Sequence, residues 1–78
     1  MDVSSYKIRP SKHFVLGWMR KWGYDIEMLR NILESSEIQK VGKHKYEAYF
    51  KQKGGRKIIF VIDEEYKEIF IITGAEGR

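Results

Sequence analysis

Residues 44–73 carry the pattern of two β-hairpins that share a central strand, and this pattern limits what the whole chain can fold into. Polar and apolar side chains alternate over residues 45–51, as in a half-buried strand. Gly54-Gly55 supplies the positive φ angles of a tight two-residue turn. The run 58–62 is apolar at every position, so we expect a mid-sheet strand with both faces covered.

The N-terminal half predicts a short strand and two helices. Residues 6–9 alternate and end at Pro10, which favours a strand. Ser11 stands at an N-cap position before apolar residues that recur at helical spacing, and Gly23 ends this helix. Asp25 is the expected N-cap of a second helix with one apolar stripe, which closes at Ser35-Ser36.

This order predicts an α+β fold in which two helices pack on an antiparallel β-meander of about four strands, with a short N-terminal strand. We expect a weak strand over 37–41 and a final strand over 68–73. Residues 74–78 have little apolar content and are expected to fray. The 78 residues therefore form a single domain, 1–78, whose ordered core spans about 6–73.

A tight turn at Gly54-Gly55 also predicts which strand residues share a face. Phe50 would lie opposite Ile59, and the other face of the sheet would carry Ile58, Phe60 and Ile71. Two helices cover one face only, so we expect the other to be an exposed apolar patch. A homodimer is the simplest cover for this patch, and a dedicated protein partner is the second.

Composition narrows the functional classes. The chain has no cysteine and a net charge of +4, which excludes disulfides and thiolate metal sites and favours polyanionic partners. Many Lys, Glu and Ile residues resemble the composition of thermophile proteins. The N-terminal residues lack the apolar core of a signal peptide, and the longest apolar run is far below the roughly 20 residues of a membrane span. A soluble, cytoplasmic protein is expected, without membrane contact.

Positive charge gathers between residues 40 and 57, where Glu47 is the one acidic residue. The basic residues of this segment are Lys40, Lys43, Lys45, Lys51, Lys53, Arg56 and Lys57. Two interpretations stay open: these side chains contact nucleic-acid phosphates, or they guard an exposed hairpin against aggregation.

The first helix holds the first candidate catalytic pair. At α-helical spacing His13 and Arg20 lie within about 20° of one line, two turns apart, with Gly17 between them. We expect Gly17 to allow close approach of a backbone or a ligand. A neutral imidazole is a suitable general base, and Arg20 would bind phosphate. The alternative is a solvated helix surface.

A second cluster begins the central hairpin. Lys43, Lys45, Arg56 and Lys57 would hold a phosphodiester and stabilise its transition state without a metal. His44 or Tyr46 would carry the proton. The alternative is a solvated start of a strand. The two histidines are far apart in the sequence and no metal-binding or phosphate-loop motif is present, so we expect no metal and no cofactor.

Several short motifs together suggest a family. They are Ser-x-His at 11–13, Met-Arg at 19–20, Gly-Tyr-Asp at 23–25, and a meander that ends in Ile-Ile-Thr at 71–73. Over roughly 6–73 the chain resembles small uncharacterised domains related to the RelE/ParE toxin superfamily, including its BrnT-like branch. The resemblance implies a microbial-ribonuclease-like fold and metal-independent cleavage of RNA by Lys, Arg, His and Tyr side chains.

By this resemblance His13 and Arg20 are the polar pair of the first helix, and Lys45 and Arg56 are sheet residues that face RNA. The sequence lacks the C-terminal catalytic tyrosine of RelE-like ribonucleases. ParE-like relatives keep the fold and act on a protein, so fold does not decide function.

Two functional hypotheses follow. The first is a toxin-like, metal-independent endoribonuclease that an antitoxin-like partner holds in check through the apolar sheet face. The second is a non-catalytic module, dimeric, that binds nucleic acid with its basic hairpin or acts through protein contacts alone.

Overall fold

The computed structural model describes residues 2–52 and 54–77. Its helices and strands follow the chain in the order β1 (Lys7–Pro10), α1 (Lys12–Phe14), the π-helical η1 (Val15–Met19), α2 (Arg20–Trp22), α3 (Ile26–Ser35), β2 (Glu37–Lys40), β3 (Lys45–Phe50), β4 (Arg56–Asp63) and β5 (Glu68–Glu76). The segments α1, η1 and α2 run into one another and form one continuous coil, so the molecule has two helical bodies.

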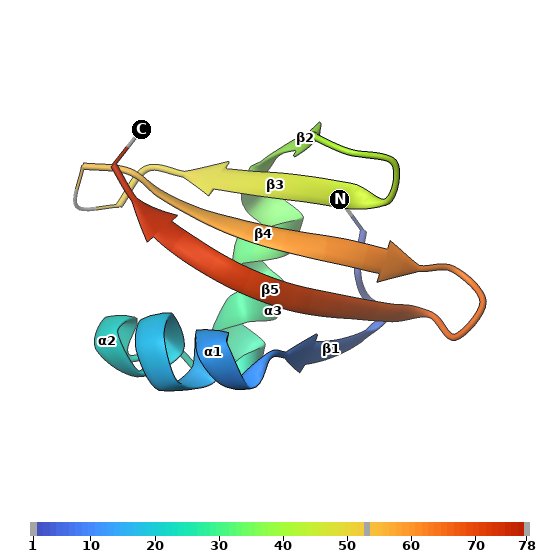
Figure 1. The fold of residues 1–78 in the computed structure, drawn as a ribbon, viewed down its shortest axis with the longest axis horizontal. Coiled ribbons are helices and arrows are strands. Elements are labelled where there is room, and N and C mark those ends of the chain that lie inside the picture. The colour runs from blue at the N-terminus through green and yellow to red at the C-terminus, as the bar shows by residue number, and fades with distance from the viewer. Residues whose placement is uncertain (1, 53, 78) are drawn as a thin grey trace.

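One five-stranded sheet has the order β1-β5-β4-β3-β2. Its neighbours are antiparallel except for β1, which pairs in parallel with β5. Helix α3 crosses behind the sheet, and the α1–η1–α2 coil lies along the β5 side (Figure 1). The predicted α+β fold with two helices on the sheet and an N-terminal strand is confirmed; the parallel pairing of that strand makes the sheet mixed.

The predicted helix ends are confirmed, and each has a local cause. The Ser11 hydroxyl accepts a hydrogen bond from the Phe14 N–H, and the Asp25 carboxylate accepts one from the Met28 N–H. Gly23 closes the coil in the left-handed conformation, with φ of 71°.

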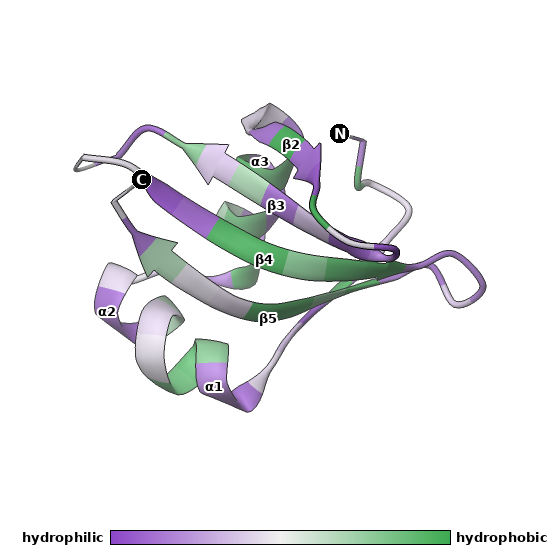
Figure 2. Ribbon diagram, turned by 45° about the horizontal axis from the view of Figure 1, so that its top comes forward, coloured by the Kyte–Doolittle hydropathy of each residue, from purple (hydrophilic) through white to green (hydrophobic). Residues whose placement is uncertain are grey.

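The hydrophobic core lies between α3, the coil and one face of the sheet. Figure 2 shows hydrophobic residues along the middle of β4 and β5, and hydrophilic residues at the turns. The largest fully buried side chains come from every layer: Phe14, Phe60, Leu29, Leu33, Ile58, Ile69, Ile71 and Val3.

The predicted hairpin register is wrong. β3 ends at Phe50 and β4 begins at Arg56, and these two residues pair directly, so the connection is longer than two residues. Gly54 and Gly55 do adopt positive φ, at 88° and 104°, but they end a wider turn. Lys53, which the sequence also places in this turn, lies outside the described residues.

This register exchanges the two predicted sheet faces. Ile58, Phe60 and Ile71, expected on an exposed face, are fully buried beneath the helices. The side chains of Ile59 and Val61 instead point to the open face.

The expectation that residues 74–78 fray is also wrong for the described part, because β5 continues to Glu76 and pairs with β4 as far as Arg56. A β-bulge between Ile59 and Phe60 shifts the register here. It brings Gly74 beneath the coil, where an added Cβ would lie 3.0–3.1 Å from the rings of Phe14, Trp18 and Trp22. The tail has little apolar content of its own, and the aromatic side chains that cover Gly74 come from the coil.

Candidate functional site

The π-helical turn sets the side-chain rows of the coil. Phe14, Trp18 and Trp22 all meet Gly74, so these aromatic residues, four positions apart, occupy one side of the coil. Their ring centroids lie 5.2 Å apart for Trp18 and Trp22 and 6.2 Å apart for Phe14 and Trp22. Residues four positions apart therefore line up along the coil, as at four residues per turn, whereas an α-helix has 3.6 residues per turn.

His13, Gly17 and Lys21 each precede one of these aromatic residues, so they form a second row on the flank of the coil. We call this row the histidine row. All three residues are exposed, and a Cβ added at Gly17 would meet nothing within 4 Å. Gly17 therefore leaves open space between an imidazole and an ammonium. No backbone of another described segment approaches it, so of the two expected uses of Gly17 the approach of a backbone is wrong and the approach of a ligand stays a prediction.

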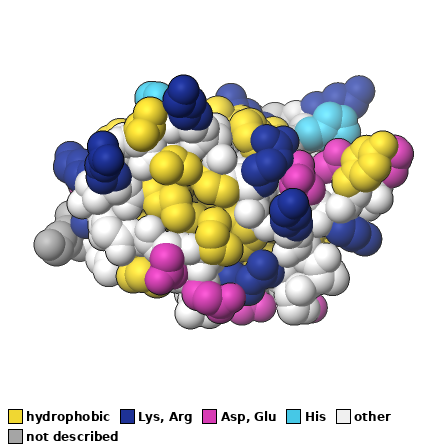
Figure 3. All heavy atoms as spheres, turned by 90° about the horizontal axis from the view of Figure 1, so that it is seen from below, with side chains coloured by type: hydrophobic (Ala, Val, Ile, Leu, Met, Phe, Trp, Pro, Cys, Tyr) yellow, Lys and Arg dark blue, Asp and Glu magenta, His cyan; other side chains and the backbone are white. Residues whose placement is uncertain are grey.

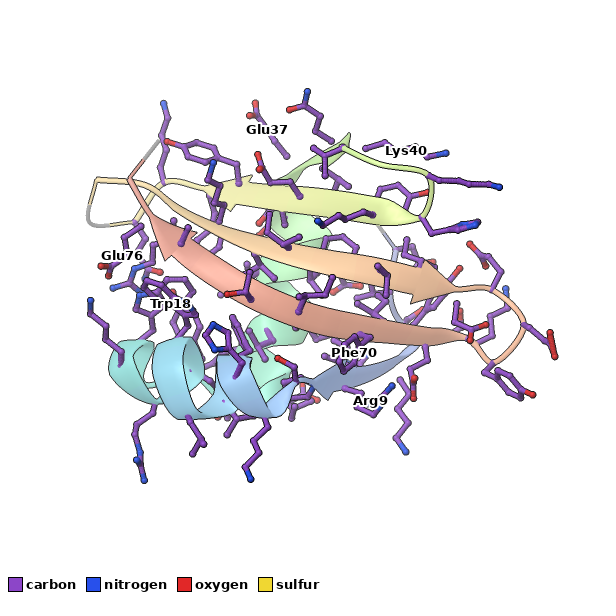
Figure 4. All side chains as sticks on the ribbon, in the orientation of Figure 1. Arg9, Trp18, Glu37, Lys40, Phe70 and Glu76 are labelled. Atoms are coloured by element: carbon purple, nitrogen blue, oxygen red, sulfur yellow. The ribbon has the colours of Figure 1, made fainter. Side chains whose placement is uncertain are left out.

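The Lys21 end of the histidine row is held in place by Glu76. The Lys21 ammonium donates to one carboxylate oxygen at 2.9 Å, and the Trp22 indole N–H donates to the other at 2.9 Å. The indole N–H and Lys21 together lower the pKa of Glu76 below its usual value of 4.5. Lys21 also lies 5.4 Å from the centre of the half-buried Trp18 ring. Figure 4 shows Trp18 and Glu76 next to each other above the coil.

Arg20 does not join His13 in this row. It follows Leu16 by four residues and borders a shallow groove with Met19 and Tyr24. The predicted alignment within about 20° assumed α-helical geometry throughout. At four residues per turn, a separation of seven positions leaves the two side chains about a quarter turn apart.

Arg56 is buried, with 7% of its surface exposed, which contradicts its predicted role as an RNA-facing residue. Its guanidinium carbon lies 4.8 Å from the Trp22 ring centre and 5.6 Å from that of Tyr24. It donates to the Tyr24 hydroxyl at 2.8 Å, and that hydroxyl donates in turn to Gln52. Arg56 therefore ties the β3–β4 turn to the end of the coil, and its Nε has no partner among the described residues.

The structure divides the second predicted cluster: Arg56 and Lys57 lie at the Glu76 end of the sheet, and the residues from Lys43 to Tyr46 lie at the other end. Lys43 and His44 are exposed in the β2–β3 connection, and Lys45 opens β3 opposite Val61. Tyr46 stacks on Phe60 of the core at a centroid distance of 5.7 Å. The Tyr46 ring therefore packs on the helix side of the sheet, whereas the exposed His44 lies in the connection before it.

Strand geometry separates this cluster from the histidine row. Glu76, which holds Lys21, pairs with Arg56, whereas Lys45 pairs with Val61. At 3.3–3.4 Å per residue and 4.8 Å per strand, these two ends of the sheet lie about 20 Å apart. One scissile phosphate cannot contact both ends of the sheet, so the candidate residues predicted from the sequence do not form a single site.

Lys57 lies on the open face of the sheet, where its ammonium is 3.6 Å from a Glu47 carboxylate oxygen. Arg9 pairs there with Glu68 at 3.1 Å. Strand alternation places as many carboxylates as cations on this face: Lys7, Arg9, Lys45 and Lys57 against Glu37, Glu47, Asp63 and Glu68. The open sheet face is therefore electrostatically mixed rather than basic.

Sequence reasoning missed three residues of the histidine row and its surroundings: Trp18, Lys21 and Glu76. A four-residue repeat of aromatic residues was visible in the sequence and would have indicated the row that precedes it. Nothing in the sequence of the small, polar tail indicated that Glu76 reaches the coil.

The described residues contain no group of three or more His, Asp or Glu side chains placed to hold a metal ion. In the same part of the chain, no helix has the length and apolar character needed to cross a membrane.

Comparisons with known proteins give a likeness of fold. No protein-family model matches the chain, and no curated protein sequence matches it. The solution structure of the conserved hypothetical protein HP0892 from Helicobacter pylori is similar, with a TM-score of 0.65 and 16% sequence identity. The match covers 91% of this chain and 93% of HP0892. At this identity the likeness concerns the fold alone.

Proposed function

We propose that this protein is a toxin-like, metal-independent endoribonuclease whose site is the histidine row. The observation that carries the proposal is the open space over Gly17, between the exposed His13 and Lys21. The net charge of +4 favours a polyanionic substrate, and the toxin type rests on the sequence resemblance to RelE/ParE-related domains.

The chemistry of this row suits RNA. A phosphate over Gly17 would lie between a group that takes a proton and a group that bears positive charge. The half-buried Trp18 ring beside Lys21 offers a surface on which an unpaired base can stack. Single-stranded RNA is the substrate that combines these features.

In the proposed reaction His13 accepts the proton of a ribose 2′-hydroxyl, and the 2′-oxygen attacks the adjacent phosphorus. The Lys21 ammonium stabilises the negative charge that develops on the phosphoryl oxygens. The 5′-oxygen leaves and takes a proton from solvent, which gives a 2′,3′-cyclic phosphate and a 5′-hydroxyl. His13 then returns its proton to solvent.

Incubation of the purified protein with a mixed-sequence RNA in EDTA tests this proposal. We expect cleavage with cyclic-phosphate ends, reduced about 10²-fold or more in His13→Ala, because a general base contributes that much. Lys21→Ala should also lose activity. Arg20→Ala is the matched control, since Arg20 is an exposed cation of the same coil outside the row, and it should keep most of the activity. Intact RNA after incubation with the folded protein would refute the proposal, as would equal cleavage by His13→Ala.

A second candidate function is RNA binding without cleavage, which the β2–β3 connection favours. Lys40, Lys43, His44 and Lys45 are all exposed there, and no acidic residue interrupts them. A group of exposed lysines at the end of a hairpin is an electrostatic contact for phosphates whatever the sequence of the RNA.

Salt-dependent binding measurements separate this function from catalysis. Lys43→Ala should weaken RNA binding and lower the salt slope by about 0.7, the value for one phosphate contact on a single strand. Lys57→Ala is the control, because Lys57 lies opposite Tyr49 toward the other end of the sheet, away from the β2–β3 connection. Equal effects of the two substitutions would argue against a role for the β2–β3 connection.

A further inference from the structure

Among the described residues, most of the exposed large apolar side chains lie on the helical layer, and two others, Val41 and Tyr66, lie in connections between strands. Leu16 is 54% exposed and Val15 is 37% exposed on the coil, and Met28 is 41% exposed on α3. Figure 3 shows apolar side chains gathered in the middle of the face seen from below, where the coil runs. We call this surface the coil face.

The coil face carries a projection and a hollow side by side. Leu16 is the projection. The hollow is a groove of about 230 Å³ that Leu16 borders together with Val15, Met19, Arg20 and Tyr24. A surface with an exposed leucine next to a mainly apolar groove can receive a copy of itself.

Charge surrounds the apolar centre unevenly. Figure 3 shows Lys and Arg side chains along the upper margin and Asp and Glu side chains at the lower margin, next to a further cation. Lys12 and Arg20 are exposed on the coil, and Asp25 and Glu27 are exposed where α3 begins. Among the described residues no ion pair joins Lys12 or Arg20 to a carboxylate of the same chain.

We propose that the coil face binds a second copy of this chain about a two-fold axis. A two-fold contact joins the same surface on both copies, so a projection must meet a hollow and a positive margin must meet a negative one. Both requirements are met on this one face: Leu16 of each copy enters the groove of the other, and the basic margin of each copy lies against the acidic margin of its partner.

The open sheet face is the competing surface and is less suited to association. Its apolar residues, which include Tyr49, Ile59, Val61 and Phe70, are only half-exposed. The Arg9 guanidinium lies 4.3 Å over the Phe70 ring and pairs with Glu68. A partner on that face would have to displace a charged side chain that already covers the apolar centre.

Sedimentation equilibrium of the full chain, from about 1 to 300 µM, tests the proposal. We expect a dimer whose dissociation constant rises roughly 30-fold or more in Leu16→Glu, as for a central interface residue. Higher salt should weaken association, because the charged margins are exposed. Val41→Glu is the matched control: Val41 is 47% exposed in the β2–β3 connection, and the dimer should persist.

Val61→Glu distinguishes the two faces. Dissociation by Val61→Glu with no effect of Leu16→Glu would place the contact on the sheet and overturn the proposal. A wild-type protein that stays monomeric over the whole concentration range would overturn it as well. Circular dichroism of each variant establishes that it is folded; Leu16 and Val41 are exposed, so their substitution should leave the fold intact.

Discussion

Substitution of Gly74 by alanine tests whether the coil and the end of β5 pack as closely as the structure indicates. A Cβ at this position would lie 3.0 Å from Trp22 Cη2 and 3.1 Å from both Phe14 Cε1 and Trp18 Cγ. These atoms belong to buried or half-buried rings of one cluster, so none can move without shifting the others. We therefore expect Gly74→Ala to destabilise the protein.

The magnitude follows from two opposing effects. One extra carbon in a filled core costs about 1–3 kcal/mol. Loss of the flexibility of glycine in the unfolded chain returns about 0.4–1 kcal/mol. From the middle of these two ranges the free energy of unfolding should fall by about 1.3 kcal/mol, which lowers the Tm by roughly 5–10 °C for a domain of this size.

Gly17→Ala is the matched control, because it makes the same chemical change where a Cβ would meet nothing within 4 Å. There alanine should stabilise the coil by about 0.8–1 kcal/mol through its higher helix propensity. Urea unfolding, followed by tryptophan fluorescence, measures both variants, since Trp18 and Trp22 lie at the contact. Equal stability of Gly74→Ala and wild type, or a change of the same sign in both variants, would refute the packing argument.

Three further predictions concern single contacts. Ser11→Ala removes the hydroxyl that accepts from the Phe14 N–H and should lower the free energy of unfolding by about 0.5–2 kcal/mol in urea titration. Trp22→Phe removes the donor to Glu76 and should destabilise the protein more at pH 7, where Glu76 is ionised, than at a pH below its lowered pKa. The lowered pKa of Glu76 contributes stability above its unfolded value of 4.5 and loses it as pH falls through the folded pKa. The free energy of unfolding of Glu76→Gln, measured by urea titration, should therefore fall less than that of wild type between pH 5 and pH 3. If the two free energies fall in parallel with pH, Lys21 and the Trp22 indole do not favour the ionised form of Glu76.

Of the first predicted pair, His13 was chosen from its place on the predicted helix, and it is exposed on the coil. Its expected companion Arg20 is a quarter turn away, because the coil has a π-helical turn over residues 15–19 that regular helical spacing does not anticipate. Arg56 was expected to be exposed as a cation of a basic hairpin, yet the aromatic rings of Trp22 and Tyr24 enclose it.

The sequence by itself determined the local elements of this protein. Ser11, Asp25 and Gly23 end their helices through hydrogen bonds and backbone angles that involve only neighbouring residues. The apolar run 58–62 predicted a mid-sheet strand, and β4 is the central strand of the sheet, although only one of its faces is covered by helices.

Only the tertiary structure decided how these elements meet. The pairing of Phe50 with Arg56 buries Ile58 and Phe60, and a shift of one residue would expose them, so the register depends on the free energy of the whole core. The extension of β5 to Glu76 likewise depends on the coil, whose aromatic residues cover a glycine far away in the sequence. Contacts of this kind join distant segments, and no local pattern of residues records them.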